Sequence, residues 1–475
     1  MSIEFSKALA VESTSIPGLQ VIDLAVHGDN RGWFKENWQR AKMTAAGLPD
    51  FGPVQNNISF NPAAGTTRGI HAEPWDKYIS VASGRIFGAW VDLRRGPTFG
   101  NTHTVELDPS KAVFVPRGVG NAFQTLEDDT AYTYLVNDHW SADAQGQYTF
   151  LNPADPTAGF EWPIPLQSAQ LSDKDRLHPW LADVEPMEGR KILVLGSNGQ
   201  LGMALRAELG DAATVEYAGH EEFNLAEPSS WPALDWRNYQ AIINAAAYTK
   251  VDDAEAPGGR RAAWAVNAAA LARLADIANA NGLTLVHVSS DYVFDGTAAV
   301  HDEDEGFSPL NVYGQTKAAG DMAVSTAARH YLIRTSWVVG SGKNFISTMI
   351  TLAEKGVDPS VVSDQIGRLS FTTDIARGIV HLLDGGAAYG TYNLTNTGPP
   401  QSWSDVAKQV FEIVGHDPQR VTPATTEAYY AGKPHAPRPA NSVLNLDKLQ
   451  STGFTPRSAS EALSDYLQVM DTRNE

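Results

Sequence analysis

A glycine-rich turn in the middle of the chain limits the fold more than any other feature. Lys191–Leu195 is a short apolar run typical of a buried strand, and Gly196, Gly199 and Gly202 follow it at a spacing of three. A helical pattern begins directly after them. This order of strand, turn and helix is typical of a site where a phosphate group meets a helix N-terminus, although an ordinary tight turn is the alternative. The sequence therefore predicts that a nucleotide-binding α/β domain starts near residue 190.

The pattern after this turn supports a doubly wound sheet. Strand-like runs recur at 241–245 and 284–288, and an alanine-rich helical stretch lies between them at 262–280. Alternating strands and helices predict a Rossmann-type parallel sheet. The last stretch, from about 340 to 475, is mixed and is expected to form a small substrate-binding lobe.

The chain before residue 166 has a different character. Short runs of β-branched and aromatic residues lie between turns, which predicts an all-β sandwich or barrel. The chain of 475 residues is also too long for a single core. We expect an all-β domain over 1–180, a linker over 181–189 that contains Pro186, and an α/β domain over 190–475. The runs expected to be strands are 78–82, 86–93, 102–107, 113–115 and 131–136.

Composition excludes several classes of protein. The net charge is −19, which disfavours binding to nucleic acid or to an anionic membrane. There is no cysteine, so disulfides, thiolate nucleophiles and cysteine-based zinc sites are excluded. We also find no apolar run long enough for a membrane span and no signal peptide. A cytoplasmic location is expected.

A tyrosine and a lysine four residues apart are candidates for proton transfer in the α/β domain. Tyr313 and Lys317 would share one helix face, where the lysine ammonium lowers the pKa of the phenol. Such a phenol can protonate a carbonyl oxygen as hydride reaches the carbon. Alone, this spacing is common on solvated helices. Ser290 strengthens the interpretation, because it follows the run 284–288 at the strand end where such sheets bind ligands.

Several strings in this half resemble one enzyme family, the dTDP-4-dehydrorhamnose reductases, which are extended short-chain dehydrogenases. They are GSNGQLG (196–202), NAAAYTKVDDAE (244–255), SSDYVFDG (289–296), PLNVYGQTK (309–317), RTSWV (334–338) and PRPANSVL (437–444). The resemblance implies that Ser290 and Tyr313 polarise the C4 carbonyl of the sugar and that Lys317 holds the nicotinamide ribose. It implies sugar-nucleotide contacts from Asp291, Trp337 and Arg438. The implied cofactor-binding residues are Gly196, Asn198, Gly199, Gln200, Leu201, Gly202, Asn224, Leu225, Ala245, Ala246, Ala247, Tyr313 and Lys317.

The resemblance implies NADPH or NADH as cofactor, with Mg²⁺ as a candidate for the reductase domain. The stretch 367–370 (GRLS) differs from the family's usual G-x-P-T, and two single positions also depart from the family pattern. Threonine is more usual than Ser290, although both supply a hydroxyl group. The family often has aspartate at the position of Asn224, near the adenosine, so the choice between NADH and NADPH stays open.

His71 is the main candidate residue in the first domain. His71 and Glu73 have the spacing of half a metal-binding cupin motif. The partner half should end in a histidine, and this chain has Asn121 there. We therefore expect no metal in this domain.

The first domain also resembles a family, the dTDP-4-dehydrorhamnose 3,5-epimerases, which have a metal-free, cupin-like jelly-roll fold. The strings are RGWFKEN (31–37), VQNNISF (54–60), RGIHAE (68–73), VDLRRGPTFG (91–100), FEWPIP (160–165) and LSDKD (171–175). By family position His71 is the base, Asp175 orients its ring and Tyr134 is the acid, while Lys77 and Arg68 stabilise an enolate. Without the resemblance, a sheet aromatic and surface charges are the simpler interpretation. The implied nucleotide-sugar ligands are Arg31, Glu36, Gln55, Asn57, Arg68, Asn121 and Lys174.

Three departures in this domain bear on its activity. The family usually has histidine at Asn121, tyrosine at Trp140 and glutamate at Gln145, so inversion at one carbon or at both stays open. The sequence predicts a bifunctional enzyme of dTDP-L-rhamnose synthesis and, from the resemblance, a homodimer through the epimerase domain. The alternatives are an inactive first domain that only binds or dimerises, a second domain that only senses nicotinamide, or another dTDP-deoxysugar pathway.

Overall fold

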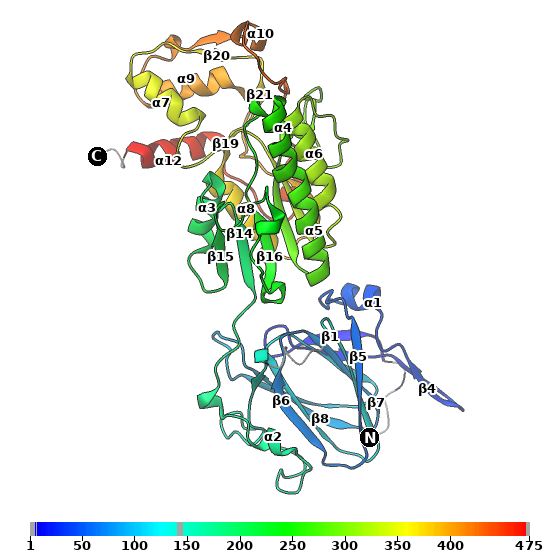
Figure 1. The fold of residues 1–475 in the computed structure, drawn as a ribbon. Helices are drawn as coiled ribbons and strands as arrows, with labels where there is room; N and C mark the ends of the chain where they lie inside the picture. Colours follow the sequence, from blue (N-terminus) through cyan, green and yellow to red (C-terminus); the bar gives the residue numbers. More distant parts are fainter. Residues whose placement is uncertain (1–4, 6, 140–145, 472–475) are drawn as a thin grey trace. The chain divides into compact units, whose positions relative to one another are not determined.

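The chain forms two compact units, Met1–Gly189 and Arg190–Glu475 (Figure 1). The computed structural model describes residue 5 and residues 7–139 and 146–471. The boundary between the units falls one residue before the strand that leads into the glycine-rich turn. Each unit has its own buried core, so each is described by itself.

Two antiparallel sheets make up most of the first unit. Their strand orders are β1-β2-β10-β7-β12-β5 and β13-β6-β11-β8-β9, and β3 pairs with β4 in a separate hairpin. The strands are β1 (Ala10–Ser13), β2 (Gln20–Asp23), β3 (Val26–Asp29), β4 (Gly32–Lys35), β5 (Gln55–Asn61), β6 (Thr67–Ala72), β7 (Lys77–Ser83), β8 (Ile86–Asp92), β9 (Thr102–Leu107), β10 (Lys111–Val115), β11 (Val119–Thr125), β12 (Thr130–Val136) and β13 (Thr149–Phe150). The described helices of this unit are α1 (Arg40–Ala45) and α2 (Asp173–Arg176).

The core of the first unit lies between these two sheets. Ile79 and Val113 of one sheet pack in the same buried cluster as Trp90 and Phe123 of the other. The alternation of side chains along each strand places one set of residues in this layer. The expected all-β domain is therefore present, and its finer assignment as a cupin-like jelly roll stays a prediction.

The segment expected to be a linker differs from the prediction. Leu181, Val184 and Met187 are buried with Ile70 in the core of the first unit. The backbone N–H of Met187 also donates to the carbonyl of Leu93 at 2.8 Å. Three apolar side chains spaced three apart thus attach most of 181–189 to the first unit, so the free connection is shorter than expected.

The second unit is built on a parallel sheet with the order β15-β14-β16-β17-β18-β23. The chain leaves β14 for β15 on one side, and β16 lies on the other side, so the topological switch point is between β14 and β16. Helices α3 to α6 and α8 connect these strands (Figure 1). The bounds are β14 (Lys191–Leu195), β15 (Val215–Ala218), β16 (Tyr239–Asn244), β17 (Thr284–Ser290), β18 (His330–Thr335), β23 (Gly390–Asn393), α3 (Gln200–Leu209), α4 (Pro257–Trp264), α5 (Ala270–Asn281), α6 (Val312–Val324) and α8 (Thr372–Asp384).

Both faces of this sheet are covered, as a doubly wound fold requires. Leu285 packs with Leu274 of α5 on one face, and the next residue, Val286, packs with Leu205 of α3 and Ile379 of α8 on the other. Successive side chains of a strand point to opposite faces, so a strand buried on both sides needs a continuous apolar run. This explains the apolar runs that mark the strands in the sequence.

A smaller mixed lobe completes the second unit around its own apolar cluster, which includes Ile346, Val410 and Leu463. No helix in the described part of the chain is both long enough and apolar enough to cross a membrane. The remaining elements are α7 (Phe345–Glu354), α9 (Trp403–Ile413), α10 (Thr426–Tyr429), α11 (Asp447–Gln450), α12 (Ala459–Asp471), β19 (Val338–Val339), β20 (Ser360–Val362), β21 (Ile366–Gly367), β22 (Ser370–Phe371), β24 (Gln401–Ser402) and β25 (Thr422–Ala424).

The substitution Leu285→Ala tests the sheet core. Leu285 is fully buried, so the loss of its side chain should destabilise the second unit by about 2–5 kcal/mol. Leu310→Ala, at an exposed position, should cost less than about 0.5 kcal/mol. Calorimetry of the full chain measures both effects, and equal losses would contradict the assigned core.

Candidate active sites

A cavity of about 900 Å³ lies in the first unit and is lined by residues of both sheets. Strands β6 and β11 of one sheet and β7 and β12 of the other contribute to its walls. Seven of the predicted residues line it together: Arg68, His71, Lys77, Asn121, Tyr134, Lys174 and Asp175. The fold therefore gathers at one place residues that lie far apart in the sequence.

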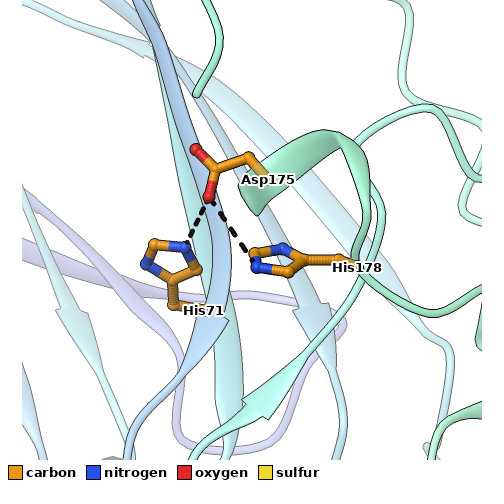
Figure 2. Close-up of side chains that lie close together, drawn as sticks. All are labelled: His71, Asp175 and His178. Carbon is orange, nitrogen blue, oxygen red and sulfur yellow. Dashed lines mark hydrogen bonds and ion pairs between the residues drawn. The ribbon is translucent and has the colours of Figure 1, made fainter. Parts of the chain in front are cut away.

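His71 and Asp175 form a hydrogen-bonded pair at this cavity (Figure 2). Nε2 of His71 lies 2.9 Å from Oδ1 of Asp175. Asp175 lies on the short helix α2, whose N-cap Ser172 accepts a hydrogen bond from the backbone N–H of Asp175. Burial alone would raise the pKa of Asp175, but the hydrogen bond and charge of His71 outweigh it and lower the pKa. Asp175 therefore remains a carboxylate that fixes the orientation of the imidazole ring.

A buried cation and a phenol lie together in the wall of the same cavity. Nζ of Lys77 is 5.3 Å from the centre of the Tyr134 ring and forms an ion pair with Glu73. Burial lowers the pKa of Lys77 to about 7. Burial also raises the pKa of Tyr134, and the charge of Arg68 partly offsets this rise. Tyr134 therefore keeps its proton at neutral pH and is able to act as an acid.

The remaining residues predicted for the first unit fall into three groups. Gln55 and Asn57 line a smaller cavity of about 160 Å³, which shares Glu73 and Tyr134 with the larger one. Arg31 and Glu36 line neither cavity: Arg31 is largely exposed and bonded to Asp29, and Glu36 pairs with Lys42. Trp140 and Gln145 lie outside the described residues.

The second unit has a cavity of about 850 Å³ at the carboxyl ends of β14 and β16, where the strand order reverses. All the predicted cofactor-binding residues line it except Gly202. Gly202 has a packing role, because a Cβ there would lie 2.2 Å from the carbonyl oxygen of Gly196. Gly196 has a φ of 75°, and a Cβ there would lie 2.7 Å from the backbone nitrogen of Ala246. The glycines thus allow the strand, the turn and α3 to approach one another closely.

Tyr313 and Lys317 line this cavity from the first turns of α6. Burial raises the pKa of Tyr313, and a hydrogen bond with Ser290 partly offsets the rise. Burial lowers the pKa of Lys317 to about 8, against the opposing charge of Asp321. The phenol is therefore protonated at neutral pH, and an ammonium lies one helical turn away.

Comparison with known proteins gives the same division of the chain. Residues 190–472 match the family described as RmlD substrate binding domain, and residues 13–183 match dTDP-4-dehydrorhamnose 3,5-epimerase. An RmlC homolog from Streptococcus pyogenes is 50% identical over 194 residues, which are 40% of this chain and 98% of that protein. The chain belongs to both families. Below, its first unit is called the epimerase domain and its second the reductase domain.

Two relatives of the reductase domain differ in their reported reaction. A probable dTDP-4,6-dihydroxy-2-methyloxan-3-one 4-ketoreductase from Streptomyces antibioticus is 38% identical over 291 residues, covering 58% of this chain and 95% of that protein. The structure of dTDP-4-dehydrorhamnose reductase from Bacillus anthracis in complex with NADP is 30% identical, with a TM-score of 0.53. It covers 59% of this chain and 99% of that one.

His178 is a residue of the epimerase domain that the sequence did not indicate. Its Nε2 lies 3.8 Å from Oδ1 of Asp175, on the same carboxylate oxygen that binds His71. Its ring packs at 4.7 Å from that of Phe150, which also lines the cavity. Its position three residues after Asp175, just past the end of α2, is the only sequence feature that could have suggested it.

His287 is a residue of the reductase domain that the sequence also did not indicate. Its Nε2 lies 3.1 Å from Nζ of Lys317, which also donates to the carbonyl of Val288 at 2.8 Å. Its Nδ1 lies 3.0 Å from Nδ2 of Asn244. Burial and the charge of Lys317 lower the pKa of His287 well below its ordinary value. A neutral imidazole therefore fixes the buried end of Lys317.

The three predicted sugar-nucleotide ligands of the reductase domain lie outside the dinucleotide cavity. Burial raises the pKa of Asp291 to about 6, while hydrogen bonds with Ser442 and Ser290 oppose the rise. Trp337 stacks on Trp403 at 3.7 Å. Arg438 forms an ion pair with Asp252 at 2.8 Å.

The substitution Gly196→Val tests the turn. A side chain there would collide with Ala246 and would force an unfavourable positive φ, so the Kd for NADPH should rise at least tenfold. Gly258→Ala is the matched control, because nothing lies within 4 Å of a Cβ at that position. Quenching of protein fluorescence by NADPH measures both, and unchanged binding by Gly196→Val would contradict the site.

Proposed function

We propose that this chain catalyses two consecutive steps of dTDP-L-rhamnose synthesis. The epimerase domain inverts carbons of dTDP-4-dehydro-6-deoxy-D-glucose next to its ketone, and the reductase domain reduces the C4 ketone of the product to an alcohol. The observation that carries the proposal is the presence of one complete proton-transfer site in each domain. These are His71–Asp175 facing the Tyr134 cavity, and Tyr313–Lys317 in the dinucleotide cavity.

In the epimerase domain the ketone acidifies the neighbouring C–H groups, and His71 accepts a proton from one face. The ionised Asp175 holds the ring and stabilises the imidazolium that forms. Arg68, and Lys77 in its protonated form, stabilise the enolate through their positive charge. Tyr134, whose pKa is raised by burial, then delivers a proton to the opposite face. Lys174 and Asn121 contact the nucleotide sugar in the same cavity, and Asn121 pairs with His71 across neighbouring strands.

In the reductase domain, the glycine-rich turn and Lys317 would hold a nicotinamide dinucleotide, which would supply hydride to C4. Tyr313 donates its proton to the oxygen as the alcohol forms, and Ser290 shares a hydrogen bond with that phenol. Lys317 holds the ribose and stabilises the tyrosinate, while His287 and Val288 fix its amine from behind. Asp291, Trp337 and Arg438 bind the sugar nucleotide.

The residues of the cavity fit a nicotinamide dinucleotide, and they give no support for a magnesium ion. Gly196 and Gly199 leave room for a pyrophosphate before the N-terminus of α3. By contrast, the described part of the reductase domain brings no three carboxylate or histidine ligands together. The steps proposed above involve no Mg²⁺, and NADPH and NADH are both proposed as the hydride donor.

We also propose that the epimerase domain forms a homodimer through the edge strand β5. This strand has β12 as its neighbour on one side, and Ile58 and Phe60 on it are 69% and 58% exposed. An exposed apolar edge strand is a template for pairing with another strand, and a second copy is the simplest partner. A second copy would also bring its own Arg31 and Glu36, which lie at the β3–β4 hairpin, to the epimerase cavity of the first copy. Within one chain these two residues do not line that cavity.

Two substitutions separate the proposed activities. His71→Ala should abolish deuterium uptake from deuterated water by the keto-sugar, yet retain NADPH-dependent reduction of supplied dTDP-4-dehydrorhamnose. Tyr313→Phe should slow the NADPH-dependent reaction at least a hundredfold and leave deuterium uptake unchanged. Product identification by NMR also shows whether one carbon or both are inverted. If His71→Ala still exchanged deuterium, the proposed base would be wrong.

The double substitution Ile58→Lys/Phe60→Lys tests the dimer. Two charges on the edge strand should yield a monomer by light scattering at micromolar concentration and should weaken epimerase activity, because Arg31 and Glu36 would no longer reach a neighbouring cavity. Val300→Lys, at an exposed apolar position in the reductase domain, is the control. A wild-type chain that is itself monomeric would contradict the proposal.

A further inference from the structure

Three metal-ligating side chains converge in the epimerase cavity. His71, Asp175 and His178 each present one ligand atom, and these atoms lie within 4.8 Å of one another (Figure 2). They form the one such group within residues 5, 7–139 and 146–471. Oδ1 of Asp175 lies between the two rings, at 2.9 Å from Nε2 of His71 and 3.8 Å from Nε2 of His178. Both imidazoles therefore already point toward a common oxygen.

The chemistry of this donor set selects a class of ion. Two imidazole nitrogens and one carboxylate oxygen suit Zn²⁺ and its neighbours in the first transition series, whereas Mg²⁺ and Ca²⁺ prefer oxygen ligands. Bond lengths of about 2.0–2.1 Å around a tetrahedral Zn²⁺ place its ligand atoms about 3.3 Å apart. The separations of 2.9 and 3.8 Å lie on either side of this value, so side-chain adjustment brings the atoms into range.

The surroundings leave room for the rest of a coordination sphere. All three residues line the cavity of about 900 Å³, so water or a substrate oxygen is able to complete the shell. These three residues also differ from the cupin metal motif, which would use Glu73 together with His71. In this structure Glu73 is instead bound to Lys77 and Trp75. Asn121 stands where that motif needs a histidine.

We propose that His71, Asp175 and His178 form a binding site for a transition-metal ion such as Zn²⁺, and that its occupation inhibits the epimerase. The inhibition, but not the binding, rests on the proposed role of His71 as base. The ion binds Nε2 of His71, and the ring proton that Nε2 donated to Asp175 moves to Nδ1, the nitrogen that would accept the substrate proton, so the base is blocked. The dinucleotide cavity of the reductase domain contains none of these three residues, so reduction continues.

A variant at His178 isolates the metal site from the catalytic pair. His178→Phe keeps an aromatic ring against Phe150 and removes one ligand, while His71 and Asp175 remain. His178→Gln is the second variant, in case the first does not fold. His27→Phe, at an exposed position in the β3–β4 hairpin, controls for the loss of any histidine.

Binding is measured first and without turnover, by titration of the full chain with Co²⁺ and detection of its visible absorption band. We expect saturation at one ion per chain for the wild type and for His27→Phe, and at least tenfold weaker binding for both His178 variants. Equal Co²⁺ binding by wild type and His178 variants would overturn the site. This result does not depend on epimerase activity, so failure of the proposed function is distinguishable.

Inhibition is measured next, by deuterium uptake of the keto-sugar in the presence of Zn²⁺. We expect Zn²⁺ to stop uptake by the wild type, a chelator to restore it, and the inhibition constant to rise at least tenfold in the His178 variants. Reduction of supplied dTDP-4-dehydrorhamnose by the same sample is the internal control and should not change. Equal Zn²⁺ sensitivity of wild type and variants, or of both activities, would contradict the proposal.

Discussion

Both active sites depend on keeping ionisable groups away from water until a proton has to move. Burial lowers the pKa of Lys77 to about 7 and of Lys317 to about 8, and it raises the pKa values of Tyr134 and Tyr313. A buried phenol keeps its proton at neutral pH. A neighbouring ammonium then stabilises the phenolate that forms when the phenol gives up this proton. The fold supports this arrangement, because each lysine has polar partners that offset the cost of burial. Glu73 forms an ion pair with Lys77, whereas Lys317 forms hydrogen bonds with His287 and with the carbonyl of Val288.

The two domains assemble their proton-transfer groups differently. In the reductase domain, Tyr313 and Lys317 are set by a single helix, so their spacing in the sequence determines their spacing in space. In the epimerase domain, His71 and Asp175 are 104 residues apart, and the pair forms only when α2 closes against β6. Local propensity cannot produce the second arrangement, which depends on the tertiary packing of residues 171–178.

This difference explains how far the sequence could predict each part. The apolar run before Gly196 and the glycine spacing are local features, and they predicted β14, the turn and α3 without any tertiary information. The short apolar runs likewise predicted β7 to β10 and β12 of the first domain and β16 and β17 of the second, whereas other strands, among them β6, β11 and β18, were not predicted. His178 escaped detection because its place in the site depends on His71 and Phe150, which are distant in sequence, and His287 escaped because its partner is the buried ammonium of Lys317. The linker was predicted too long because polar neighbours of Leu181, Val184 and Met187 concealed an apolar spacing of three.

The lining of the cavities indicates what the fusion can contribute physically. Every residue that lines the epimerase cavity belongs to the first unit, and every residue that lines the dinucleotide cavity belongs to the second. The described lining of each cavity therefore comes from a single domain. The covalent connection guarantees equal numbers of the two catalysts and a high local concentration of the second near the first.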